Sequence, residues 1–270
     1  MLSTLNTRDR SRYGWVRDIP DPRDHKFAVR HEDFANLPTS VDLRPKCPPV
    51  YNQGQIGSCT ANSLAGAFEF DLLKQGITDF TPSRLFIYWC ERAVEGSTAY
   101  DAGAQIRDGV KVLAKLGVPP EPEWPYDDTP ADFEGRFPSN ARAGQKPPAQ
   151  VFADATHNEA LVYQRVAQDV NHLRSALAGG FPVAFGFTVF SSFESPEVAA
   201  TGVAPMPQPG DQVLGGHAVL IVGYDDAKQV FTVRNSWGAG WGDSGYFTLP
   251  YAYVTNPELA SDFWVLQRVS

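Results

Sequence analysis

The hydrophobic periodicity changes from helical to strand-like along this chain, and this change constrains the fold more than any other feature. Apolar residues recur at helical spacing in three early segments, residues 63–76, 81–93 and 105–117. Later, apolar residues gather in short runs rich in valine and aromatics, residues 182–190, 217–225, 229–237 and 245–251. A helical half followed by a β-rich half predicts an α+β fold with two lobes.

A proline-rich passage, residues 119–148, separates the two halves and is typical of a loop. One more helix is expected at residues 157–177, before the strands begin. Residues 1–37 are charged and too few to bury a core of their own. We therefore divide the chain into an N-terminal segment (1–37), a mainly helical lobe (38–148) and a mainly β lobe (149–270). A cleft between two such lobes is where a ligand site is expected.

Composition excludes several classes of function. The net charge is -8 and no basic run occurs, so neither nucleic acid nor a membrane surface is expected as a partner. No apolar run has the length of a secretory signal or a membrane span. The three cysteines fit a reducing compartment and allow at most one bridge, between Cys47 and Cys90. A cytoplasmic protein is the expectation, with non-classical secretion left open.

The segment NQGQIGSCTANS places Cys59 where a helical pattern begins, just after the flexible Gly57. The positive end of a helix dipole favours thiolate over thiol, and the thiolate is the nucleophilic form. A cysteine in this position therefore suits nucleophilic catalysis. Taken alone, a cysteine in this position is more often a small buried apolar residue.

Two later segments supply what such a nucleophile needs, namely a base and a group that orients the base. His217 opens the valine-rich run HAVLIVGYD, and Asn235 follows the next strand in RNSWGAGWGDSGY. Each could be structural by itself, since a histidine can open a strand and an asparagine can form a turn. The order Cys, His, Asn with glycines nearby favours a catalytic set.

Together these segments resemble the papain family of cysteine peptidases. Gln53 lies six residues before Cys59, as in that family, and residues 217–224 resemble its histidine motif. Residues 235–246 match its NSWG motif without a gap, and residues 37–44 resemble the usual start of a mature enzyme. The resemblance implies a papain-like fold, with a helical left lobe, a β-barrel-like right lobe and the active site between them.

The resemblance also implies the roles of individual residues. Cys59 would attack a peptide carbonyl, with His217 as its base and Asn235 orienting the imidazole. The side-chain amide of Gln53 and the backbone N–H of Cys59 would form the oxyanion hole. Trp237 would shield the His–Asn contact from water. The residues expected to contact substrate are Gly103, Gly186, Ala218 and Trp237.

Three positions depart from the family pattern. Thr60 stands where tryptophan usually follows the nucleophile, and Ile56 stands where a cysteine usually anchors the preceding loop. Gly216 replaces an aspartate found before the histidine in plant members. None of these changes removes a member of the expected catalytic set.

The resemblance further implies an endopeptidase that is made as a zymogen and acts on peptide or protein substrates. Residues 1–37 are much shorter than a cathepsin prodomain, as in short-prosegment bacterial members of the family. We expect this segment to lie extended in the protein's own cleft, with Tyr13, Trp15 and Phe27 as anchors. A monomer is the family's usual state.

Other functions stay open at this point. A catalytically silent papain-fold protein could bind peptides, and an acyl transferase could use the same Cys-His-Asn site with an amine as acceptor. No cofactor or metal is expected, because the cysteines lack C-x-x-C pairing and the histidines have no ligand spacing. The five histidines are His25, His31, His157, His172 and His217.

Overall fold

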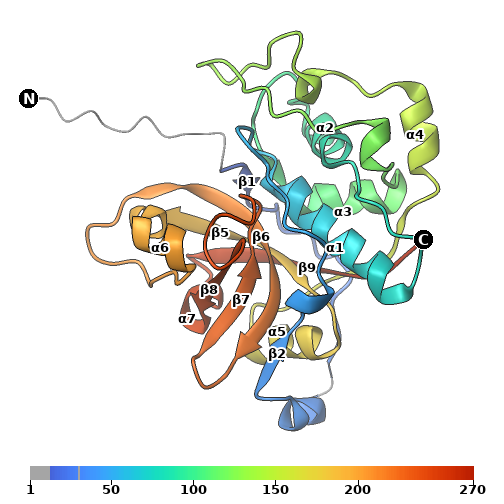
Figure 1. Cartoon of the computed structure of the whole chain (residues 1–270). Coiled ribbons are helices and arrows are strands. Elements are labelled where there is room, and N and C mark those ends of the chain that lie inside the picture. Colours follow the sequence, from blue (N-terminus) through green and yellow to red (C-terminus); the bar gives the residue numbers. More distant parts are fainter. Residues whose placement is uncertain (1–12, 30) are drawn as a thin grey trace, which may run out of the picture.

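The computed structural model describes residues 13–29 and 31–270. Helices α1 to α4 form one side of the molecule and an antiparallel sheet forms the other, so the expected α+β architecture with two lobes is confirmed (Figure 1). The helices are α1 (Cys59–Gln75), α2 (Arg84–Glu95), α3 (Ile106–Lys115), α4 (Ala149–Ala155), α5 (Val170–Ala178), α6 (Pro196–Thr201) and α7 (Tyr251–Val254). No helix among the described residues is both long and apolar enough to cross a bilayer.

Helix α1 is the central element because it is buried on all sides. Every residue from Cys59 to Leu72 is buried, which explains why the helix is apolar all round rather than along one stripe. Its body packs against strands of the β lobe as well as against α2 and α3. It ends at Gly76, whose φ of 68° is the left-handed conformation that glycine adopts without strain. The helix therefore places Cys59, its first residue, at the junction of the lobes.

Helices α2 and α3 have one apolar face each, as the periodicity predicts. The segment predicted to be helical from residue 81 becomes a helix only at Arg84, with Ser83 as its N-cap. The Ser83 hydroxyl accepts a hydrogen bond from the Phe86 N–H at 3.2 Å. Residues 81–83 are extended instead, since the Thr81 carbonyl accepts from Glu121 and the Ser83 N–H donates to Pro119. Because of these bonds, the helix begins only at Arg84.

The β lobe is built on a seven-stranded sheet with the order β4-β9-β5-β6-β7-β8, and β2 pairs with β6. All these pairs are antiparallel. The aromatic side chains that fill its core are Phe185, Phe187, Phe231, Phe247, Phe263 and Trp264. The strands are β2 (Ser40–Asp42), β4 (Ala160–Arg165), β5 (Val183–Phe190), β6 (Val213–Asp225), β7 (Val230–Arg234), β8 (Tyr246–Pro250) and β9 (Ala260–Val269).

The helix predicted at residues 157–177 is wrong in its first half. Residues 160–165 form β4, which pairs with the last strand, β9. A second helix signal begins only at Asp169, whose side chain caps α5 by accepting from the Asn171 and His172 N–H groups. Pairing with a distant strand overrides the local helical pattern here, and β9 itself was not expected from the sequence.

The described part of the N-terminal segment runs extended over the junction of the lobes. Its strand β1 (Trp15–Val16) pairs in parallel with β3 (Ala104–Gln105) of the helical lobe. Further on, the Phe27 N–H donates to the Arg165 carbonyl at 2.9 Å, beside β4. A 3₁₀ helix, η2 (His31–Asn36), then packs on α5 before the chain enters the sheet as β2. Other 3₁₀ turns are η3 (Arg44–Lys46), η4 (Glu121–Glu123), η5 (Arg142–Gly144) and η6 (Ser191–Glu194).

Candidate active site

The three residues of the expected catalytic set meet where α1 faces the sheet. His217 lies on β6, and its Nε2 is 2.8 Å from Asn235 Oδ1. An amide oxygen only accepts, so Nε2 carries the proton of this bond and the lone pair of the neutral ring is on Nδ1. Cys59 lies against the same part of β6, because it interacts with the backbone of Ala218. The arrangement can accept a thiol proton on an imidazole of fixed orientation.

Cys59 is fully buried in this state of the protein. Burial raises the pKa of its thiol to about 12, and hydrogen bonds from the backbone of Ala218 and Gly14 lower it only in part. A bond that favours the thiolate must come from an N–H, so Gly14 turns its N–H toward the sulfur. The N-terminal segment therefore lies against the nucleophile, and the effect of burial on the thiol pKa outweighs that of these hydrogen bonds.

Gln53 ties the loop before Cys59 to the loop that follows β7. Its backbone N–H donates to the Ser236 carbonyl at 2.8 Å, and its side-chain Oε1 accepts from the Ser236 hydroxyl at 2.7 Å. Its Nε2 donates to the Ile56 carbonyl at 3.0 Å. The Ser236 N–H in turn donates to Asn235 Oδ1 at 2.8 Å. One network thus orients both the amide of Gln53 and the asparagine beside His217.

Trp237 covers the imidazole ring of His217. Its ring stacks on that of His217 with 4.9 Å between centroids and 25° between planes. Tyr13 of the N-terminal segment meets both rings edge-on, at 6.1 Å from His217 and 6.3 Å from Trp237. The aromatic packing keeps water from the His–Asn bond, which maintains its strength in a low dielectric.

Gly103 and Gly186 lie against the N-terminal segment, whereas Ala218 is paired with Gly186 across β5 and β6. A β-carbon on Gly186 would be 1.9 Å from the Trp15 ring, and one on Gly103 would be 2.0 Å from the Gly14 carbonyl oxygen. The Trp15 side chain therefore occupies the space beside Gly186, and the Gly14 backbone occupies the space beside Gly103. The small size of the two glycines makes room for these groups.

The departures at residues 60 and 216 have local structural reasons. The Thr60 hydroxyl donates to the fully buried carboxyl group of Glu91 at 2.8 Å, which a tryptophan could not do in the same way. Burial raises the pKa of Glu91 well above its usual value. Gly216 lies beside Trp15, whose carbonyl oxygen would be 2.6 Å from a β-carbon at that position.

Several residues of the site were not found from the sequence. The Tyr126 hydroxyl contacts both ends of the loop that precedes Cys59. It lies 2.6 Å from Ser58 Oγ and donates to the Gln53 carbonyl at 2.9 Å. Ser236 anchors Gln53, and its place between Asn235 and Trp237 was the available signal. No local pattern marks Tyr126, which reaches the site from the proline-rich passage.

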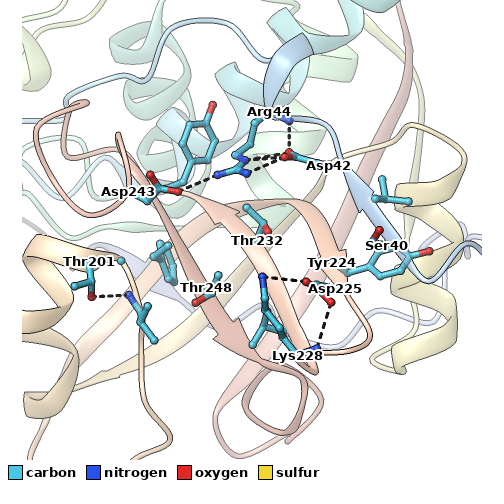
Figure 2. A pocket seen from close by; sticks show the side chains of 16 residues that line it. Ser40, Asp42, Arg44, Thr201, Tyr224, Asp225, Lys228, Thr232, Asp243 and Thr248 are labelled. Carbon is cyan, nitrogen blue, oxygen red and sulfur yellow. Dashed lines mark hydrogen bonds and ion pairs between the residues drawn. The ribbon is translucent and has the colours of Figure 1, made fainter.

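A separate surface pocket of about 400 Å³ lies where β2, β7, β8 and the end of α6 meet (Figure 2). Its charged side chains pair with one another. Arg44 contacts Asp42 at 2.8 Å and Asp243 at 3.0 Å, and Lys228 contacts Asp225 at 3.2 Å. None of the predicted site residues lines it. We therefore place the candidate active site at the junction of the lobes.

Residues 37–262 match the family model of the papain family cysteine proteases, and the chain belongs to that family. It is 48% identical to xylellain, a cysteine protease from Xylella fastidiosa, with a TM-score of 0.93 over 99% of this chain and 100% of that one. It is also 38% identical to an uncharacterized peptidase C1-like protein of Acanthamoeba polyphaga mimivirus, over 96% of this chain and 87% of that protein. The digestive procathepsin L2 proteinase of Tenebrio molitor is similar at 25% identity and a TM-score of 0.69, over 97% and 80% of the two chains. The papain-like fold and the resemblance to the short-prosegment bacterial type are thus confirmed.

Replacing Gln53 by alanine should lower kcat by about 10²–10³, the usual cost of losing one oxyanion donor. KM should change little, because the donor acts on the charge that develops during reaction. Ser236→Ala is the matched control, since it removes the bond to Gln53 Oε1 but keeps the amide N–H groups. Steady-state kinetics with residues 1–37 removed would check this. A Gln53→Ala loss no larger than that of Ser236→Ala would contradict a direct role for the amide.

Proposed function

We propose that this protein is a thiol-dependent endopeptidase made as a zymogen. The observation that carries the proposal is the joint placement of Cys59, His217 and Asn235 beneath an extended segment of the same chain. A site that already holds a peptide across its nucleophile is suited to hold a peptide substrate. The resemblance to papain-family endopeptidases favours cleavage within a chain.

The reaction follows from the roles of the chain's own groups. His217 Nδ1 takes the Cys59 proton, and the thiolate attacks the peptide carbonyl to form a tetrahedral intermediate. The Gln53 amide and the Cys59 N–H stabilise the oxygen of that intermediate. The imidazolium then gives its proton to the leaving amine, and the acyl-enzyme is hydrolysed by a water that the same histidine activates.

The N-terminal segment is proposed to block the site without being cut by it. The Gly14 carbonyl oxygen accepts from the Ala104 N–H at 2.7 Å, while the Gly14 N–H faces Cys59. The contact that the described part of the segment makes with the nucleophile is therefore through an N–H group. Trp15, the residue after Gly14, lies against Gly186, and β1 pairs in parallel with β3.

A buried set of charges holds the segment beyond Trp15. Asp24 of the segment pairs with Arg107 of α3 at 2.5 Å, and both side chains are almost fully buried. Arg165 of β4 contacts Asp18 at 3.3 Å and Asp262 of β9 at 2.9 Å. The Asp18 carboxylate also accepts from the Trp264 indole N–H at 2.9 Å. Buried pairs of this kind fix register, which supports a defined inhibitory position.

The proposal is tested with the chain lacking residues 1–37, a reductant, and a fluorogenic Phe-Arg or dibasic peptide. An internally quenched peptide blocked at both ends distinguishes cleavage within a chain from removal of end residues. We expect turnover of both and stoichiometric labelling of Cys59 by an epoxide thiol trap. Labelling without any cleavage, but with transfer to an added amine, would indicate an acyl transferase. Neither labelling nor turnover would indicate a silent peptide-binding protein.

A further inference from the structure

The loop from Gln53 to Ser58 needs support from outside itself, because it carries one oxyanion donor and leads directly into the nucleophile. No disulfide ties it down, since Cys47, Cys59 and Cys90 are all free thiols. Its middle is held instead by a carboxylate from another loop. The Gly57 N–H donates to both oxygens of Asp101 at 3.0 Å each.

Asp101 is in turn held by a buried tyrosine of α2. The Tyr88 hydroxyl donates to Asp101 Oδ1 at 2.5 Å and accepts from the Gly103 N–H at 3.2 Å. A continuous series of hydrogen bonds therefore runs from Gly57 through Asp101 and Tyr88 to Gly103. These bonds connect the oxyanion loop to β3, the strand edge that pairs with the N-terminal segment. Ala104 follows Gly103, and its N–H donates to the Gly14 carbonyl.

The tyrosine itself has little freedom to move. Its side chain is fully buried, and the Arg92 guanidinium lies 3.9 Å from the centre of its ring. Arg92 also donates to the Tyr88 and Tyr100 carbonyls, at 3.1 and 3.0 Å. The arginine thereby fixes both the tyrosine and the chain just before Asp101.

The two ends of this series form opposite walls of one narrow passage. A β-carbon on Gly14 would lie 1.7 Å from the Gly57 carbonyl oxygen, and one on Gly103 would lie 2.0 Å from the Gly14 carbonyl oxygen. A bound backbone thus fits between Gly57 and Gly103 with no spare width. The distance between these walls decides whether a peptide can sit over the nucleophile.

We infer that Asp101 is a positioning residue, held by Tyr88, that sets the spacing between the oxyanion loop and the peptide-binding edge. This inference rests on the proposed peptidase function. Asp101 touches neither the reacting atoms nor the described side chains of Cys59 and His217. It acts through Gly57, two residues before the nucleophile, and through Tyr88 on Gly103.

The test compares Asp101→Ala, Asp101→Asn and Tyr88→Phe in the chain lacking residues 1–37. We expect kcat/KM for peptide hydrolysis to fall about 10- to 100-fold in Asp101→Ala, with a lower kcat and a raised KM, as for loss of charged hydrogen bonds. Asp101→Asn, which keeps one acceptor for Gly57, should lose less. Tyr88→Phe should mainly raise KM, because it frees the Gly103 edge.

A second readout separates positioning from general damage. Iodoacetamide alkylation of Cys59 needs the thiolate but neither the oxyanion loop nor the peptide edge, so its rate should stay within about twofold of wild type. Asp169→Ala is the matched control, because Asp169 also accepts two backbone N–H groups but caps α5 in the other lobe. It should lower the unfolding temperature without changing kcat/KM.

Two results would overturn the inference. One is a kcat/KM within twofold of wild type in both Asp101→Ala and Tyr88→Phe. The other is a fall in alkylation that parallels the fall in hydrolysis, which would mean damage to the nucleophile itself. Wild-type turnover is measured in the same assay. If the wild type does not hydrolyse the peptide, both the proposed function and this inference are wrong. If the wild type is active and the variants have the same kcat/KM, only the inference is wrong.

Discussion

Replacing Cys59 by alanine in the chain that lacks residues 1–37 is expected to lower kcat for peptide hydrolysis by at least about 10⁴-fold. The thiolate is the only proposed nucleophile, and the remaining oxyanion donors can stabilise an intermediate but cannot form the acyl-enzyme. The measurement is the initial rate on a fluorogenic peptide, with the mass of the intact protein after treatment with an epoxide trap. The wild-type chain should gain one adduct and the variant none.

Cys47→Ala is the control for this experiment, because Cys47 is also a free thiol but its sulfur bonds to the Leu43 carbonyl, away from the cleft. Its hydrolysis rate should stay close to that of wild type. Burial raises the pKa of Cys47, which keeps it unreactive toward the trap. Substantial hydrolysis by Cys59→Ala, or an adduct on it, would remove Cys59 from the proposed role.

Removing residues 1–37 should raise the initial rate of peptide hydrolysis by about 100-fold or more relative to the full chain. Trp15→Ala in the full chain should yield much of this gain, since replacing a buried tryptophan by alanine in a protein core typically costs about 3–5 kcal/mol of stability. Trp15→Phe should fall between, because it fills the space beside Gly186 but loses the indole bond to Asp262 at 3.2 Å. Rates are taken while gels show the chain to be intact.

The rate at which iodoacetamide alkylates Cys59 at different pH values gives a second test of inhibition by the segment. With the thiol pKa raised to about 12 by burial, the full chain should react with iodoacetamide very slowly at pH 7 and faster only as the pH rises. Without the segment, reaction at pH 7 should be fast. Val16→Ala is the matched control, because that neighbouring side chain is exposed. If the full chain hydrolyses the peptide as fast as the chain lacking residues 1–37, the zymogen proposal is wrong. If the Trp15→Ala variant of the full chain is as inactive as the unchanged full chain, the inhibition comes from another part of the segment.

The fold could be predicted from the sequence where local signals act alone. Helix α1 is a long run of buried residues that ends at a glycine, and the strands β5 to β8 are short apolar runs rich in valine and aromatics. Strands β4 and β9 could not be predicted, because β4 forms by pairing with β9, almost a hundred residues away, and β9 in turn pairs with both β4 and β5. The start of α2 was displaced for a similar reason, since residues near Pro120 hold residues 81–83 extended.

The candidate site divides in the same way. Cys59, His217, Asn235 and Gln53 lie in motifs that a single sequence displays, and their roles stay predictions until variants are assayed. Their supports could not be predicted, because they act through single hydrogen bonds across the fold. Tyr126 reaches Ser58 from 68 residues away, and Asp101 reaches Gly57 from 44 residues away. No spacing rule exists for such contacts.

The pairing of β2 with β6 has a consequence for how inhibition would end. Because β2 follows η2 directly and is fixed to the strand that carries His217, the chain after a cut near residue 37 stays anchored while the segment before it is freed. A tethered segment competes with substrate at an effective concentration of about millimolar, and a severed one competes only at its bulk concentration. One broken peptide bond would thus turn a permanent competitor into one that is lost by dilution, and activation would be irreversible without any change in the enzyme itself.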